Sequence, residues 1–228
     1  TQEKPETVSV SIDGEGRILG AQGVGREGVD KRIDVIATAT RGGLRVDDLV
    51  DLDLSYAPPF GAAKDPVMML GMIADNVLSG RLTQHDPVAP LDPETTLVLD
   101  VRNPGEWDRG HIEGAMLVPQ PDVAASIEEI RRAAAGRPIV VHCASGFRSY
   151  LANRTLAGAG IDSANVSGGF TTLAIAKPQL VTHPQTSPAS ATTSGTTVSS
   201  TNAGRNANPS GSTIVTPSLA AASSNSRS

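Results

Sequence analysis

Hydrophobic positions follow two different periods in the first 80 residues. Alternating apolar and polar residues predict two short strands at 7–13 and 17–24, and the turn sequence from Asp13 to Gly16 joins them into a β-hairpin. A helical period then runs from Asp30 to Gly42. A second helix is expected at 66–78, because Pro66 suits a first helical turn and an apolar face follows it. The pattern predicts a small α+β unit.

The pattern changes in the second half of the chain. Residues 97–100 and 138–143 are continuous apolar runs, which are typical of strands buried in a parallel sheet. Each run is followed by a loop and a helical pattern, at about 122–135 and at about 148–158, and a further short strand is expected at 164–166. Alternating strands and helices predict an α/β fold with a parallel central sheet flanked by helices.

Proline and serine content suggest where these units end. Three prolines within 84–93 predict a stiff connector, which divides the chain into a unit at 1–83 and a unit at 84–180. The last 48 residues, 181–228, hold 21 Ser or Thr and no aromatic or acidic residue. Such a segment cannot build a hydrophobic core, so a disordered tail is expected there.

Charge and cysteine content exclude or disfavour several classes of partner and site. The net charge is −5, and residues 1–180 hold 17 basic against 24 acidic residues, which disfavours nucleic acid and anionic membranes as partners. A single cysteine excludes an intrachain disulfide and a cysteine-rich zinc site, and no metal site is expected. With a polar start and no long apolar run, a cytoplasmic location is expected.

One glycine motif has the spacing of a dinucleotide-binding site but is not expected to form one. Residues 23–28 fit the spacing GxGxxG between a possible strand and a helix. The preceding strand, however, alternates like one strand of an exposed hairpin, and no second apolar strand follows the helix. These glycines are therefore expected to serve turns rather than to bind a dinucleotide.

The strongest chemical signal surrounds Cys143. This cysteine ends an expected strand and is followed by a tight loop and a helix. Successive N–H groups of such a loop can curve around the sulfur, and the helix N-terminus adds positive potential, so a thiolate would be stabilised. Gly146 permits the curve and Arg148 adds a positive charge. The alternative interpretation is an inert cysteine buried at a strand end.

Loop length distinguishes two chemistries. Protein tyrosine phosphatases place five residues between the cysteine and the arginine, which is enough to surround a phosphate. Here four residues separate Cys143 from Arg148. The smaller loop suits a persulfide sulfur, and a phosphatase or arsenate reductase remains the less favoured alternative.

Several segments together resemble the rhodanese family. They are Leu99-Asp100-Val101-Arg102 with Glu106, then 110–115 with Pro119, the cysteine loop, and 165–170 with its Gly168-Gly169 pair. The resemblance covers about 91–177. It implies a rhodanese-like α/β domain and a two-step transfer in which Cys143 accepts sulfur from a donor and passes it to a thiol. The residues expected to bind the substrate or the persulfide are Ala144, Ser145, Gly146, Phe147, Arg148, Ser149 and Arg102.

Other polar residues of these segments are expected to have supporting roles, with a catalytic His111 as the less favoured alternative. Asp100, Glu106 and His111 are expected to be structural, since Asp at a strand end and His beside a glycine turn usually pair locally. His142 precedes the cysteine on a strand and is expected to point to the opposite face.

The N-terminal unit resembles a different family. Residues 20–25, 30–34 and 53–67 are similar to the C-terminal dimerisation domain of flavoprotein disulfide reductases, in the branch of coenzyme A-disulfide reductase and NADH oxidase. The resemblance implies a homodimer, with Tyr56, Pro58, Pro59 and Phe60 as a possible interface. FAD and NAD(P)H are expected only in a full-length parent, and this chain alone is expected to bind no cofactor. Because the FAD-binding and NAD-binding domains of that family have no counterpart in this chain, it is expected to be the C-terminal portion of such a protein.

Two functions follow as expectations. The first is a sulfurtransferase that uses a small donor, such as thiosulfate, a persulfide or a coenzyme A derivative, and a thiol acceptor, within a disulfide or persulfide reductase. The second is a non-catalytic module for dimerisation, docking or redox sensing. The apolar face with Met68, Met69 and Met72 is expected to be core or interface rather than a ligand pocket.

Overall fold

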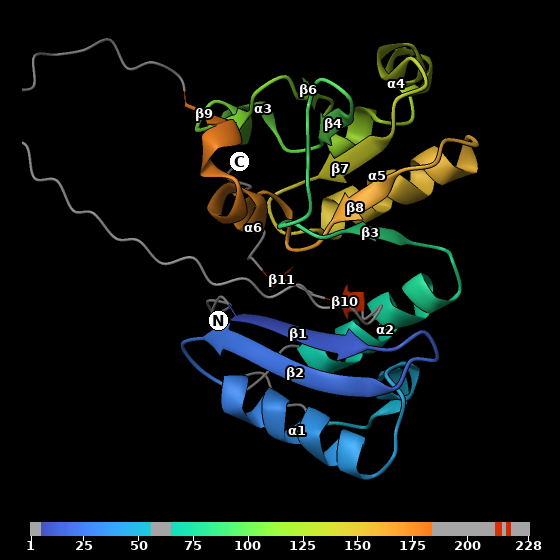
Figure 1. The fold of residues 1–228 in the computed structure, drawn as a ribbon, viewed down its shortest axis with the longest axis vertical. Coiled ribbons are helices and arrows are strands. Elements are labelled where there is room, and N and C mark those ends of the chain that lie inside the picture. The colour runs from blue at the N-terminus through green and yellow to red at the C-terminus, as the bar shows by residue number, and fades with distance from the viewer. Residues whose placement is uncertain (1–5, 56–64, 184–212, 216–217, 220–228) are drawn as a thin grey trace, which may run out of the picture.

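The computed structural model describes residues 6–55, 65–183, 213–215 and 218–219. Figure 1 shows two units, with α2 of the first unit facing β3 of the second. The expected interface residues Tyr56, Pro58, Pro59 and Phe60 lie outside the described residues.

The first unit is an antiparallel hairpin covered by helices. Strands β1 (Glu6–Ile12) and β2 (Ile18–Gly25) pair antiparallel, and α1 (Val29–Arg41), the 3₁₀ helix η1 (Asp47–Asp51) and α2 (Pro66–Leu78) follow. The alternating residues Val8, Val10 and Ile12 are buried and share a core with apolar residues of both α-helices. The expected hairpin and helices are confirmed. Because β2 pairs antiparallel, residues 23–28 do not form the βαβ turn of a dinucleotide site.

Helix α2 has a well-defined beginning. The Asp65 side chain accepts a hydrogen bond from Val67 N at 2.9 Å, and Pro66 occupies the first turn. Asp65 also lies 3.5 Å from the Arg32 guanidinium on α1. The capping and ion-pairing therefore fix the start of α2 against α1.

The second unit is built on a parallel sheet. Its strand order is β3 (Thr83–His85), β8 (Ala164–Val166), β7 (Ile139–His142), β4 (Leu97–Asp100) and β6 (Met116–Leu117), and each pair is parallel. Separate hydrophobic clusters contain Val141 with Leu99 and Val140 with Val98. Adjacent residues of one strand face opposite sides, so both faces of the sheet are buried. This explains the continuous apolar runs.

Helices flank this sheet, as expected. They are α3 (Pro104–Trp107), α4 (Ile127–Ala134), α5 (Phe147–Gly158) and α6 (Gly169–Ala176), with the 3₁₀ helices η2 (Gln120–Asp122) and η3 (Pro178–Leu180). Helix α4 begins later than the expected residue 122, because η2 and a turn occupy the residues before it. Residues 84 and 85 belong to β3 rather than to the expected connector, since they pair with β8.

The C-terminal segment also contains short strands. Strand β9 (Val181–Thr182) pairs with β5 (His111–Ile112), while β10 (Thr213–Val215) and β11 (Ser218–Leu219) pair antiparallel with β1. At these residues the structure differs from the expected disordered tail. Backbone pairing along a strand edge needs no hydrophobic core of its own, so composition alone gave no signal for it.

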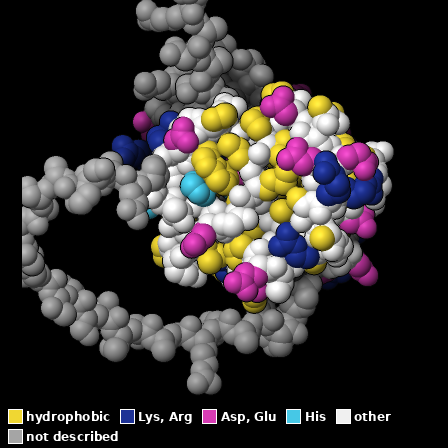
Figure 2. All heavy atoms as spheres, turned by 90° about the horizontal axis from the view of Figure 1, so that it is seen from above, with side chains coloured by type: hydrophobic (Ala, Val, Ile, Leu, Met, Phe, Trp, Pro, Cys, Tyr) yellow, Lys and Arg dark blue, Asp and Glu magenta, His cyan; other side chains and the backbone are white. Residues whose placement is uncertain are grey.

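The surface carries mixed charges. On the face in Figure 2, basic and acidic side chains are interspersed among hydrophobic patches. Within the described ranges, no helix is long and apolar enough to cross a membrane.

Candidate active site at Cys143

Cys143 lies directly after β7, at the carboxyl edge of the parallel sheet, and 1 % of its surface is exposed. The chain then turns sharply at Gly146, which has φ +112° and precedes the first residue of α5. This φ lies in the region that favours glycine. The expected sequence of strand, tight loop and helix is therefore present, and α5 directs its N-terminus at the loop.

Two donors reach the sulfur from the loop and from α5. The Gly146 N–H donates to Cys143 Sγ at 3.1 Å, and the Ser149 hydroxyl lies 3.4 Å from the same sulfur. Ser149 is fully buried, and its hydroxyl is also 3.1 Å from the Gly146 carbonyl oxygen. These donors and the helix N-terminus favour negative charge on the sulfur.

Helix α6 and strand β8 hold the carbonyl groups of the cysteine loop. Phe170 N donates to the Cys143 carbonyl at 2.7 Å, and both the N–H and the hydroxyl of Thr171 donate to the Ala144 carbonyl. Asn165 Nδ2 donates to the Gly146 carbonyl at 3.2 Å. Because the carbonyl groups of the loop accept hydrogen bonds from these neighbouring elements, they point away from the sulfur. The N–H groups of the loop can then point toward it.

The close approach depends on Gly169. Its φ is +63°, and a Cβ at this position would lie 2.6 Å from the Cys143 carbonyl oxygen and 2.7 Å from Ser145 N. Contacts below 3.0 Å with backbone atoms require the loop to move. The pair Gly168-Gly169 therefore allows α6 to pack directly on the cysteine loop.

Arg148 is held by a carboxylate. Its two terminal nitrogens each donate to an oxygen of Glu106 at 2.7 Å, which is a bidentate ion pair. The hydrogen bond to Arg148 holds the pKa of Glu106 below its ordinary value. The bond to Glu106 raises the pKa of Arg148, and the nearby Cys143 sulfur contributes in the same direction. The positive charge beside the loop is therefore largely balanced.

Arg102 occupies an interior position. Its guanidinium donates to Asp100 at 2.6 Å and to the Gly110 carbonyl at 2.9 Å, and the side chain is 5 % exposed. It also stacks 3.8 Å from the centre of the Phe170 ring. This geometry places the Arg102 guanidinium in the interior and engages its donors, and the donor-binding role expected from the sequence stays a prediction.

The histidines lie away from the sulfur chemistry. His142 is fully buried near Asp100 and Phe170, and burial lowers its pKa. His111 stacks on Trp107 with 3.7 Å between ring centres. Among the residues placed by the structure, no group of three or more His, Cys, Asp or Glu could hold a metal ion.

Of the expected binding residues, the structure places Gly146 and Ser149 within hydrogen-bond distance of the sulfur and Arg148 near it, while roles for Ala144, Ser145 and Phe147 stay predictions. Sequence reasoning did not assign roles to Asn165, Thr171 or Gly169 individually. The Gly-Gly pair was a visible signal for close packing, whereas the hydrogen bonds of Asn165 on β8 and Thr171 on α6 depend on how these two elements lie against the cysteine loop.

Comparison with known proteins agrees with this geometry. Residues 83–175 match the family described as the rhodanese-like domain. The chain is 49 % identical over 55 residues to the coenzyme A disulfide reductase of Staphylococcus aureus (strain bovine RF122 / ET3-1), covering 24 % of this chain and 13 % of that reductase. The corresponding protein of strain JH9 is 47 % identical over the same length.

Two solved structures cover both units. The reduced Bacillus anthracis CoADR-RHD has a TM-score of 0.75 and 36 % identity, over 80 % of this chain and 33 % of that chain. The NAD-dependent persulfide reductase from A. fulgidus has a TM-score of 0.66 and 34 % identity, over 75 % of this chain and 31 % of that chain. This chain thus spans about a third of those structures and less of the curated reductases. Residues 83–175 form a rhodanese-like domain, in a chain related to the coenzyme A disulfide and persulfide reductases.

Proposed function

We propose that Cys143 transfers sulfur as a cysteine persulfide. The observation that carries this proposal is the Gly146 N–H, which donates to Cys143 Sγ at 3.1 Å at the N-terminus of α5. A preformed donor aimed at sulfur stabilises the charged states that occur before and after transfer. The four-residue spacing between Cys143 and Arg148 supports persulfide over phosphate chemistry.

The first step would join the thiolate to the outer sulfur of a donor such as thiosulfate. A bond forms between Cys143 Sγ and that sulfur, the bond from that sulfur to the sulfite group breaks, and sulfite leaves with the electron pair. In the second step an acceptor thiolate attacks the outer sulfur of the persulfide, which regenerates the Cys143 thiolate. Because Cys143 is only 1 % exposed, the loop must move locally to admit a donor.

The wider activity is part of the same proposal. The two structural relatives named above support a setting in which the transferred sulfur is reduced within a disulfide or persulfide reductase. FAD and NAD(P)H would be held by the larger protein, with the first unit forming a homodimer interface. A coenzyme A derivative or another persulfide would then serve as donor, in the cytoplasm.

The test is the intact mass of the chain after incubation with thiosulfate, compared with Cys143→Ser. The expected result is a gain of one sulfur atom, roughly 32 Da, that a thiol or cyanide reverses and that the variant lacks. No adduct in a folded sample would favour the docking or redox-sensing module instead.

A further inference from the structure

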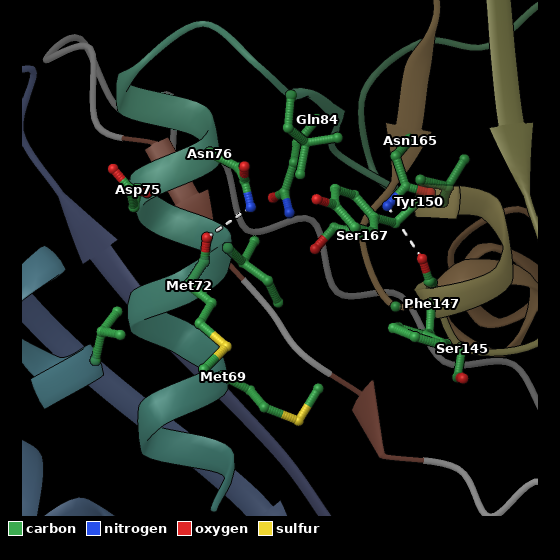
Figure 3. A pocket seen from close by; sticks show the side chains of 16 residues that line it. Met69, Met72, Asp75, Asn76, Gln84, Ser145, Phe147, Tyr150, Asn165 and Ser167 are labelled. Carbon is green, nitrogen blue, oxygen red and sulfur yellow. Dashed lines mark hydrogen bonds between the residues drawn. The ribbon is translucent and has the colours of Figure 1, made fainter. Parts of the chain in front are cut away.

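A pocket of about 370 Å³ lies between the two units. One wall comes from α2, with Met69, Met72 and Ile73, and the opposite wall includes Gly146 and Phe147 beside the cysteine loop. Figure 3 shows these walls facing each other. The volume is at the lower end of the range of about 300–1,000 Å³ for small-molecule sites, so the occupant would be small.

Polar atoms without partners gather at one end of this pocket. Gln84 Oε1, Asn165 Oδ1 and Ser167 Oγ are buried, and none has a hydrogen-bond partner among the described residues. Asn165 and Ser167 are each 5 % exposed, and Figure 3 shows Gln84 and Ser167 directed toward α2. A buried polar group without a partner is costly, so a ligand that pairs with these atoms after a small rotation of their side chains into the pocket would gain affinity.

The pocket specifies the chemistry of its occupant. Two carbonyl oxygens, from Gln84 and Asn165, can accept hydrogen bonds, and the Ser167 hydroxyl can donate one. An amide supplies both N–H donors and a carbonyl acceptor. Among the described lining residues there is no Lys, Arg or His, while Asp75 is present, so an anion would find no opposite charge. The methionines and Ile73 offer an adaptable apolar surface for a hydrocarbon chain.

We propose that this pocket binds a neutral aliphatic amide. Its amide group pairs with Gln84, Asn165 and Ser167, and its hydrocarbon chain packs against α2. This assignment goes beyond sulfur transfer, because binding requires neither a thiol nor a reaction at Cys143. It also replaces the expectation that the face with Met69 and Met72 is core or interface only.

Methionine methyl groups provide a direct test. The full chain contains four methionines, and Met69 and Met72 line the pocket, whereas Met68 and Met116 are not among its lining residues. In the chain labelled with ¹³C at the methionine methyl groups, titration with hexanamide should shift the Met69 and Met72 signals saturably and leave Met116 unchanged. The absence of a shift, or equal shifts of all four signals, would overturn the proposal.

Two analogues test the polar end. Methyl hexanoate keeps the chain but has no N–H donor, and hexanoate carries a negative charge. Both should bind more weakly than hexanamide, by about threefold to tenfold for methyl hexanoate, the equivalent of one hydrogen bond. In Ser167→Ala the affinity for hexanamide should fall by a similar factor. Equal binding of the amide and the ester in the wild-type chain would contradict the assignment of the polar end.

A matched pair of variants tests the location. Ile73→Arg places a charge in the apolar wall, while Ile175→Arg places the same charge on α6 at a residue that is 79 % exposed. Hexanamide binding should be lost in the first variant and retained in the second, and the unchanged Met116 signal reports an intact second unit. Retained binding in Ile73→Arg would place the site elsewhere and overturn the proposal. Because hexanamide carries no sulfur, these results are independent of the mass measurement on Cys143.

Discussion

The carboxyl ends of β4 and β7 lie side by side, with Asp100 and His142 in register, yet the loops that follow use their polar groups differently. After β4, Asp100 and Arg102 neutralise each other at 2.6 Å in the interior. After β7, the Cys143 sulfur receives neutral donors, the Gly146 N–H and the Ser149 hydroxyl. The two charges of the first loop already neutralise each other, so that loop stabilises little further charge. The donors of the second loop can stabilise a negative charge that develops on the sulfur.

Phe170 connects these two loops. Its ring lies 3.8 Å from the Arg102 guanidinium, and its N–H donates to the Cys143 carbonyl at 2.7 Å. The buried charge pair can therefore position the α6 segment that holds the cysteine loop. The loop after β4 therefore contributes to stability and the loop after β7 to reactivity, and α6 contacts both.

Removing Arg102 should produce the largest effect on stability. Arg102→Met leaves the Asp100 carboxylate buried without its partner, which typically costs about 3–5 kcal/mol. The measurement is urea unfolding followed by fluorescence of Trp107, the single tryptophan.

The double variant Asp100→Asn/Arg102→Met is the matched control, because it removes the uncompensated charge as well. It should recover at least half of the lost free energy of unfolding. A loss below about 1 kcal/mol in the single variant would show that the pair is not a buried anchor.

Adding a methyl group at Gly169 should act mainly on the reactive loop. The Cβ of Gly169→Ala would collide with the backbone of Cys143 and Ser145, so the loop must shift. Misplacement of a reacting group by about 1 Å can cost about 100-fold in rate. The rate of persulfide formation with thiosulfate, measured by intact mass, should fall by about that factor.

Gly160→Ala is a suitable control for backbone strain. Gly160 has φ +70°, close to the +63° of Gly169, but a Cβ there meets nothing within 4 Å. This variant should lose some stability and keep its rate of persulfide formation. Equal losses of rate in both variants would show that strain, rather than contact with the loop, is responsible.

Releasing Arg148 should have a smaller effect on activity. In Glu106→Gln the guanidinium loses its bidentate carboxylate and becomes more attractive to an anionic donor. The value of kcat/KM for thiosulfate should rise by about threefold to tenfold at low salt, mainly through a lower KM, and the gain should shrink as salt is added.

Asp108→Asn removes the same charge from the same turn at an exposed residue. It should change kcat/KM far less. A similar rise in both variants would indicate a general effect of net charge, and a fall in Glu106→Gln would mean that the ion pair itself positions the loop.

The sequence predicted the parts of this site that local patterns encode. Apolar runs marked β4 and β7, and a cysteine followed by glycine and a helix marked the loop. The sequence did not show which residue each arginine would pair with. Arg102 and Arg148 both looked available to bind an anion, because a sequence does not show that Asp100 and Glu106 would reach them first.

Contacts between distant segments were also missed. The pairing of β10 with β1 joins residues about 200 positions apart, and the pocket beside α2 exists because the two units face each other. The sequence placed Met68, Met69 and Met72 on one apolar face, whereas only Met69 and Met72 line the pocket, and periodicity does not say what lies opposite a helix face. Tertiary arrangement, rather than local propensity, decided these features.

Two ionisable residues beside these loops should lose their stabilising effects in different pH ranges. Burial lowers the pKa of His142 below its ordinary value of 6.5, so the unfolded chain binds the proton first. Stability should therefore fall as pH drops below about 6.5, by at most about 1.4 kcal/mol per pH unit, until the lowered pKa is passed. The pKa of Glu106 is lowered from 4.5, so its contribution is present above that value and is lost at more acidic pH.

Unfolding of the wild-type chain and of His142→Leu between pH 7 and pH 4 separates the two ranges. The variant stays neutral at position 142, so its decline below pH 6.5 should be shallower than that of the wild type, and the remaining decline belongs to His85, whose pKa burial also lowers. Glu106→Gln should give the converse result, with the decline below pH 6.5 retained. If His142→Leu kept the full decline of the wild type, His85 alone would account for it and the prediction for His142 would be wrong. A shallower decline in the variant would show that the buried His142 beside Phe170 makes the β7 strand end sensitive to pH, whereas the fixed pair of Asp100 and Arg102 after β4 is not removed by the same substitution.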